Sequence, residues 1–146
     1  MMKFNALQFV NSLSCDLTGE FDDLEEMIQA NKAGEDNADK IHSSYTHLNS
    51  LIQGFEYMVE FIADEEDRKE LTEIIAQKRE EHSGFYPRCA SIIYTKRLGK
   101  AVDITWCHHT ADPDEFTVRV QGHFTRTFHT TAEVKEYINA LAEGEA

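Results

Sequence analysis

ADKIHSSYTHLNSLIQGFEYMVEFI, residues 38–62, carries the clearest structural signal in this chain. Apolar side chains recur in it at alternating intervals of three and four residues, the heptad pattern of a packed helix. The members of this seam are Ala38, Ile41, Tyr45, Leu48, Ile52, Phe55, Val59 and Ile62. At 1.5 Å per residue, the seam predicts a helix about 37 Å long. Leu51, Met58 and Phe61 widen the apolar stripe, which favours packing in a helical bundle over an isolated two-stranded coil.

Other apolar stripes predict three more helices in the first half of the chain. We expect one over about 3–14 and a second over about 19–31, with Thr18 as its N-cap. Asp64 can cap another helix, over about 65–82. The residues Ser83–Pro87 read as the end of that helix and as a junction.

The sequence after this junction alternates with a period of two, which is typical of strands. We expect four strands, at about 89–97, 100–108, 115–121 and 123–129, and a closing helix over about 132–143. Thr130 or Thr131 would cap that helix. The predicted fold class is therefore α+β: an acidic N-terminal helical bundle over 1–84, then a four-stranded antiparallel meander with a C-terminal helix over 85–146, in one shared fold unit.

The hydrophobic pattern also predicts the strand register. A three-residue turn after the third strand places Val120 opposite Phe124 and Phe116 opposite Phe128. Across the preceding pair of strands, Trp106 faces Phe116. In this register Arg126 falls on the apolar face, so its side chain has to reach past a sheet edge.

Composition excludes several classes of protein. No stretch reaches the run of about 18 apolar residues that a membrane helix needs. The three cysteines have no CxxC spacing, so we expect free thiols and a cytoplasmic protein. The net charge is −13, and it is unevenly distributed. Residues 1–84 hold 7 basic and 19 acidic residues, whereas residues 85–131 hold 6 basic and 4 acidic ones.

The acidic residues of the helical half are the first candidate for a binding surface. They comprise Asp22, Asp23, Glu25, Glu26, Asp64, Glu65, Glu66, Asp67, Glu70 and Glu73. Such carboxylates could contact a protein partner with a basic surface, or imitate a phosphate backbone as small acidic inhibitors of DNA- or RNA-handling enzymes do, often in phage. The alternative is a solvated face that keeps the protein soluble.

Two further sets of residues offer alternatives. Arg88, Lys96, Arg97 and Lys100 gather around the first predicted hairpin, where they could hold single-stranded RNA or DNA. The predicted register brings Cys107, Glu115 and His129 into one row, with His109 nearby; these are zinc ligands, or a nucleophile with its base. Because the row has no ligand-spacing signature, ordinary exposed polar residues of a half-wet sheet are the favoured interpretation.

No catalytic or cofactor motif is present. The sequence therefore predicts a non-enzymatic interaction protein without a cofactor, which modulates a basic protein partner through its acidic helices. A homodimer through the long helix is a further expectation. Direct nucleic-acid binding and a metal-binding or hydrolytic role are the alternatives.

Overall fold

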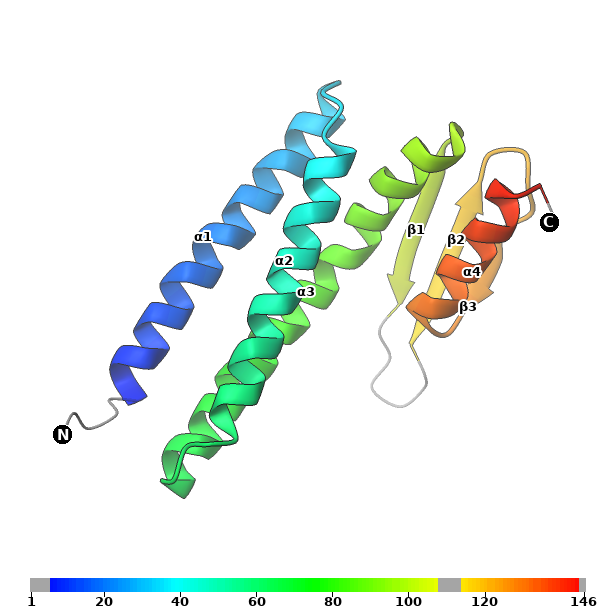
Figure 1. Ribbon diagram of the computed structural model, residues 1–146. Helices are drawn as coiled ribbons and strands as arrows, with labels where there is room; N and C mark the ends of the chain where they lie inside the picture. The colour runs from blue at the N-terminus through cyan, green and yellow to red at the C-terminus, as the bar shows by residue number, and fades with distance from the viewer. Residues whose placement is uncertain (1–5, 108–113, 145–146) are drawn as a thin grey trace. The chain divides into compact units, whose positions relative to one another are not determined.

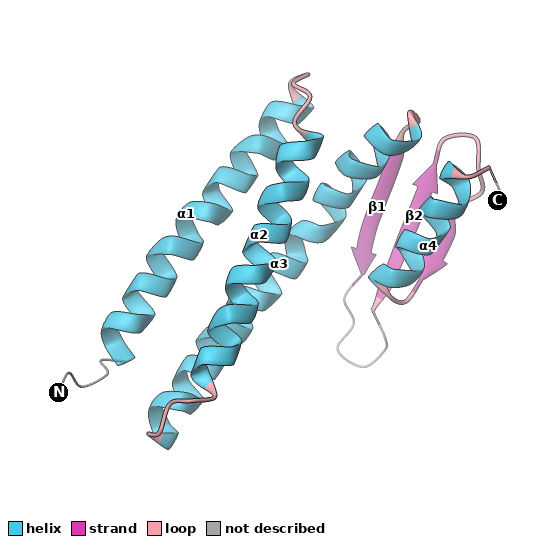
Figure 2. Ribbon diagram, viewed as in Figure 1, coloured by secondary structure: helices cyan, strands magenta, loops and turns pink. Residues whose placement is uncertain are grey.

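The computed structural model describes the backbone of residues 6–107 and 114–144, and the side chains of these ranges from Cys15 onwards. Four helices and a three-stranded antiparallel sheet make up this part of the chain, an α+β fold (Figures 1 and 2). The chain divides into two compact units, which we call the helical unit (1–85) and the sheet unit (86–146). None of the described helices is both long and apolar enough to cross a membrane.

The first helix, α1, is continuous over Ala6–Lys32, so the expected pair of helices and the Thr18 cap are wrong. Leu17, Phe21, Leu24 and Ile28 recur at intervals of four, three and four residues, and all four are buried. Burial of this unbroken stripe is worth several kcal/mol. The glycine after Thr18 costs a helix only about 1 kcal/mol, so it does not interrupt α1.

The predicted long helix is present as α2, Ala38–Val59. Five residues of the seam are buried, namely Ala38, Ile41, Leu48, Ile52 and Val59. Phe55, expected in the core, is only half-buried. Met58 and Phe61, expected to widen the core stripe, are exposed instead.

Helix α3 runs over Glu65–Leu98 and passes through both units, which makes the expected strand at 89–97 wrong. Its start is as predicted, because the Asp67 amide donates to Asp64 Oδ1 at 3.0 Å. Pro87 lies inside the helix, where it was expected to end one. The apolar spacing explains the difference: Tyr86, Ala90, Tyr94 and Leu98 recur every fourth residue and pack into the core of the sheet unit.

Gly99, which lies between the first two expected strands, ends this helix. Gly99 has a φ of +66°, and its amide donates to the Thr95 carbonyl at 3.0 Å. This left-handed residue after the last helical turn is a common way to close a helix. A turn signal therefore occurs where predicted, but a helix precedes it.

The strands β1 (Val102–Cys107), β2 (Glu115–Val120) and β3 (Arg126–Phe128) pair in sequence order. The predicted register is confirmed: Trp106 faces Phe116, and Phe116 faces Phe128. The expected pairing of Val120 with Phe124 is wrong, because β3 begins only at Arg126. A turn with Gly122 at a φ of +84° occupies this stretch instead.

Arg126 lies on the edge strand β3, and its side chain is exposed. It faces Val118 in the register, and its guanidinium carbon lies 5.7 Å from the ring centre of Phe128 and 5.3 Å from that of Tyr137. These cation–π contacts let the charge stay at the edge strand while the stem covers apolar surface.

The last helix, α4, spans Thr131–Ala142, and Thr130 caps it by accepting the Glu133 amide at 3.1 Å. Val134 and Ile138 of α4 are fully buried in a core that also contains Val118 and Phe116. The sheet unit is thus a small meander with one face covered by α4 and by the end of α3.

Candidate functional site

The acidic residues form two separate groups in the helical unit, one on α1 and one at the start of α3 (the helices are labelled in Figure 1). Asp22, Asp23, Glu25 and Glu26 lie in the second half of α1, beyond Glu20, whose carboxylate is 4.0 Å from His47 of α2. The second group begins at Asp64, just after α2, where Arg68 donates to the Ile62 carbonyl at 3.3 Å. Twelve residues of α2 separate His47 from Val59, so the groups are about 18 Å or more apart.

An exposed apolar surface lies beside the second acidic group. Tyr57 (64% exposed), Met58 (50%) and Phe61 (69%) form what we call the α2 patch. The rings of Tyr57 and Phe61 meet edge to face with centroids 5.0 Å apart, so the patch is internally ordered. Phe61 precedes Asp64 by only three residues, a chain distance of at most about 11 Å.

The sequence also contains a spacing that indicates this patch, although the heptad seam is the more obvious pattern. Gly54, Tyr57, Met58 and Phe61 are spaced by three and four residues, so they share a face of their own. That face lies opposite the buried positions Ile52 and Val59. The end of α2 is therefore apolar on two sides, and only one of them is used by the core.

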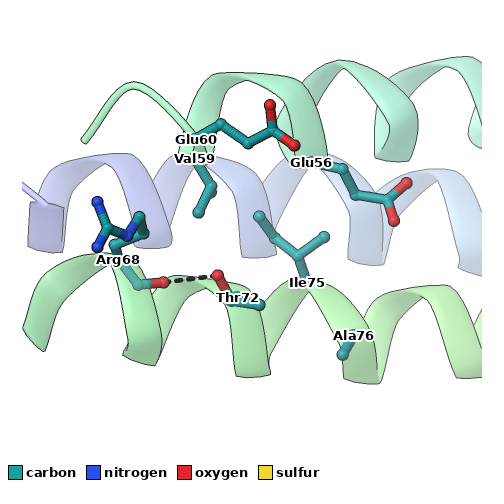
Figure 3. A pocket seen from close by; sticks show the side chains of 7 residues that line it. All are labelled: Glu56, Val59, Glu60, Arg68, Thr72, Ile75 and Ala76. Atoms are coloured by element: carbon teal, nitrogen blue, oxygen red, sulfur yellow. Dashed lines mark hydrogen bonds between the residues drawn. The ribbon is translucent and has the colours of Figure 1, made fainter. Parts of the chain in front are cut away.

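A groove of about 370 Å³ runs between α2 and α3 near the same end (Figure 3). Its lining residues are Glu56, Val59, Glu60, Arg68, Thr72, Ile75 and Ala76. Val59 and Ile75 point toward one another across it, while the two glutamates lie along the α2 rim. The rim is only partly available for binding, because Arg79 holds Glu56 at 2.6 Å.

Arg79 joins two helices of the helical unit. Arg79 of α3 contacts two residues of α2, donating to Asn49 Oδ1 at 2.5 Å and to Glu56 Oε1 at 2.6 Å. One turn further along α3, His82 is 3% exposed. Its Nε2 lies 2.9 Å from the Tyr45 carbonyl, and its ring stacks on that of Tyr45. Burial lowers the pKa of His82, and the nearby Arg79 charge lowers it further.

The predicted basic hairpin does not form, because Arg88, Lys96 and Arg97 lie on α3. Nine residues separate Arg88 from Arg97, which places them on opposite faces of the helix. The structure instead brings Arg97 together with Lys100 and His123 around a small pocket in the sheet unit. Sequence reasoning missed His123 because it placed this residue inside the fourth strand.

The proposed metal row is assembled only in part. Cys107 is exposed and faces Glu115 across the β1–β2 ladder, as the register predicts. His129 Nδ1 lies 3.2 Å from the Asp114 carbonyl, which orients its ring through the backbone. His109 falls outside the described residues. In the part of the chain that the structure does describe, no three His, Cys, Asp or Glu side chains gather in a metal-binding arrangement.

In comparisons with known protein families, curated proteins and solved structures, nothing matches this chain. The features that bear on its function are therefore the α2 patch, the acidic residues and the pocket of the sheet unit.

Proposed function

We propose that this chain is a non-enzymatic interaction protein, which binds a protein partner with a basic surface at the end of the helical unit where α2 stops and α3 begins. The observation that carries the proposal is the α2 patch, three large apolar side chains exposed beside a run of carboxylates. An apolar patch bordered by charge is the usual composition of a protein-binding surface.

The patch would supply most of the binding energy. Aromatic side chains are enriched among the residues that dominate interfaces. Tyr57 and Phe61 already contact one another, so ordering them on binding costs little conformational entropy. Both side chains are exposed by more than half, so a partner would remove much apolar surface from water.

The neighbouring carboxylates would select the partner by charge. Glu65 and Glu66 are exposed in the first turn of α3, and Glu70 is exposed one turn later. A negative field of this kind attracts a basic surface and speeds the encounter. Imitation of a phosphate backbone is less well supported, because aromatic side chains adjoin this group and the other acidic group lies on a different helix, α1.

A homodimer through α2 would not use the predicted seam. Ile41, Leu48 and Ile52 of the seam are fully buried within the chain, so they are not available to a second copy. The α2 patch is the surface that a homodimer could use. The helical unit of a second copy lacks the basic surface that the carboxylates favour, since residues 1–84 carry 19 acidic and only 7 basic residues.

Photo-crosslinking tests the location of the site. A photoreactive amino acid replaces Tyr57 in one variant and Thr46 in a control; both positions are exposed on α2. We expect a crosslink to a basic protein in the native host only from position 57, and mass spectrometry identifies it. Equal crosslinking from both positions would contradict the proposal, and a crosslink between two copies would replace it with a homodimer.

Association kinetics with the identified partner test the role of charge. Reversing Glu65, Glu66 and Glu70 to Lys should slow association at least tenfold at low salt, because charge governs encounter more than residence time. A matched control reverses Asp22, Asp23 and Glu26 of the acidic group on α1. Salt of about 1 M, with a Debye length of roughly 3 Å, should erase most of the effect. If both variants slow equally, only the total charge matters; if neither slows, the carboxylates are merely solvated.

A further inference from the structure

The small pocket in the sheet unit is the second place where the structure gathers unused chemistry. Its volume is about 120 Å³, enough for several water molecules and hence for a phosphate group. Arg97, Lys100 and His123 line it with nitrogen donors, while Leu98, Val120 and Leu141 form its apolar wall. Its residues come from the end of α3, the turn after β2 and the end of α4.

Backbone hydrogen bonds hold the main chain of the pocket walls in place. Gly99 closes α3 and starts the turn that carries Lys100. On the opposite wall, the His123 amide donates to the Val120 carbonyl at 3.0 Å. The two walls are joined, because the Gln121 amide donates to the Ala101 carbonyl at 2.9 Å. The pocket therefore exists before any ligand arrives.

No carboxylate pairs with the two full charges of the pocket among the side chains that the structure describes. Within residues 6–107 and 114–144, neither Arg97 nor Lys100 forms an ion pair, although the chain holds 27 acidic residues. Glu143, next to the lining residue Ala142, pairs with neither. The ends of α3 and α4 each contribute roughly half a negative charge. Two cations exceed these dipoles, so the pocket attracts an anion.

An exposed aromatic residue follows the lining residue His123 in the chain. Phe124 is 93% exposed and directly follows His123, so their Cα atoms are about 3.8 Å apart. A ring this accessible gains nothing for folding, but it offers a flat face on which a base can stack. The distance between the two Cα atoms is within the span of one nucleotide.

We infer that Arg97, Lys100 and His123 bind the phosphate of a nucleoside phosphate whose base stacks on Phe124. The two cations form charge-assisted hydrogen bonds to phosphate oxygens, and His123 adds a third donor. The ring accepts any base, because stacking does not read the edges of bases. This chemistry occurs both in a free mononucleotide and in a single-stranded nucleic acid. The site is independent of the function proposed for the α2 patch.

Amide chemical shifts test this site in titrations of the whole chain at low salt. The probes are inorganic phosphate, adenosine monophosphate and a short single-stranded oligonucleotide. We expect each to shift the amides of Lys100 and His123. Combined Arg97→Gln and Lys100→Gln substitution should weaken binding of all three at least tenfold. A control with Arg119→Gln and Lys135→Gln removes the same charge from exposed positions of the same unit and should change affinity less than threefold.

Phe124→Ala separates stacking from phosphate binding without a risk to the fold. It should weaken binding of the monophosphate and the oligonucleotide about fivefold or more, and leave inorganic phosphate unchanged. Tighter binding of the oligonucleotide than of the monophosphate by tenfold or more assigns the site to single strands, and equal binding assigns it to mononucleotides. The inference fails if no probe binds, if both double variants bind alike, or if Phe124→Ala leaves the monophosphate and the oligonucleotide unaffected.

Discussion

Cations are used differently in the helical unit and in the sheet unit. In the helical unit, Arg79 joins α3 to Asn49 and Glu56, and Arg68 donates to the Ile62 carbonyl. In the sheet unit, Arg97 and Lys100 lie beside one another, and neither has an ion-pair partner among the described residues. Arg79 thus joins two helices, whereas Arg97 and Lys100 are available to a ligand.

The two units also differ in what they bury. The helical unit contains the buried polar side chains Asn37 and His82. Asn37 Nδ2 donates to the Met27 carbonyl at 3.2 Å, which ties the loop before α2 back to α1. The buried residues of the sheet core, such as Val118 and Ile138, are apolar. A change in pH should therefore act mainly on the core of the helical unit.

The largest expected effect is on the core of the helical unit. Ile52→Ala should lower its free energy of unfolding by about 2–5 kcal/mol, because Ile52 is fully buried. Phe55→Ala should cost less than the roughly 3–5 kcal/mol typical of a fully buried aromatic residue, because Phe55 is half-buried. Urea unfolding followed by circular dichroism measures both losses. A loss below about 1 kcal/mol for Ile52→Ala would show that the seam does not form the core.

Trp106 makes the same experiment a test of the division into units. It is the only tryptophan of the chain, and it belongs to the sheet unit. In the Ile52→Ala variant, the unfolding midpoint followed by Trp106 fluorescence should shift less than the midpoint followed by circular dichroism. The circular dichroism signal comes mostly from helical residues. Equal shifts in both signals would show that the two units unfold together.

The next largest expected effect is a pH dependence of the unfolding free energy, which the titration of His82 causes. Because burial lowers the pKa of His82 in the folded state, the unfolded chain binds the proton more readily. Stability is therefore complete above the unfolded pKa of about 6.5, and it falls as the pH drops from there towards the lower folded pKa. Because His82 binds a single proton, it can change the unfolding free energy by at most about 1.4 kcal/mol per pH unit.

A variant separates this effect from other titrations. His82→Gln keeps a donor near the Tyr45 carbonyl but removes the titrating group. Unfolding free energies between about pH 7.5 and 5 should fall more steeply for the natural chain than for the variant. The sheet unit, followed by Trp106 fluorescence, should respond less. Parallel slopes for the two proteins would mean that His82 does not govern the pH response.

Sequence patterns correctly predicted those elements in which the apolar pattern agrees with burial in the core. The register of β1, β2 and β3 followed from Trp106, Phe116 and Phe128, because a slip by one residue would expose all three. The seam of α2 and the cap at Thr130 were likewise readable. These signals are local, and the tertiary structure reinforces them.

The failures occurred where a local signal and burial disagreed. The period-two alternation suggested a strand over 89–97, but burial of Tyr86, Ala90, Tyr94 and Leu98 on one side favours a helix there. Thr18 suggested an N-cap, but the buried apolar stripe of α1 continues on both sides of this residue. The groove and the pocket were out of reach, since both combine residues from elements whose packing the sequence does not specify.

The smallest effect compares two glycines, one in each unit. A methyl group added to Gly54 of α2 would meet only open space, so Gly54→Ala should stabilise the helical unit by about 0.5–1 kcal/mol. Gly99 has a φ of +66°, so Gly99→Ala should destabilise the sheet unit by roughly 1–2 kcal/mol, although the added methyl group would also meet no neighbouring atom there. Circular dichroism follows the first change and Trp106 fluorescence the second.

The sign of the first change bears on the α2 patch. Gly54 shares a face with Tyr57, Met58 and Phe61, and the core does not use this face. If Gly54→Ala stabilises the protein, the glycine weakens α2 beside the patch without any benefit to packing. Local rules are usually broken where a surface serves function, so a gain supports binding at this face. A loss of stability would show that Gly54 has a structural role in α2, and that it gives the patch no such support.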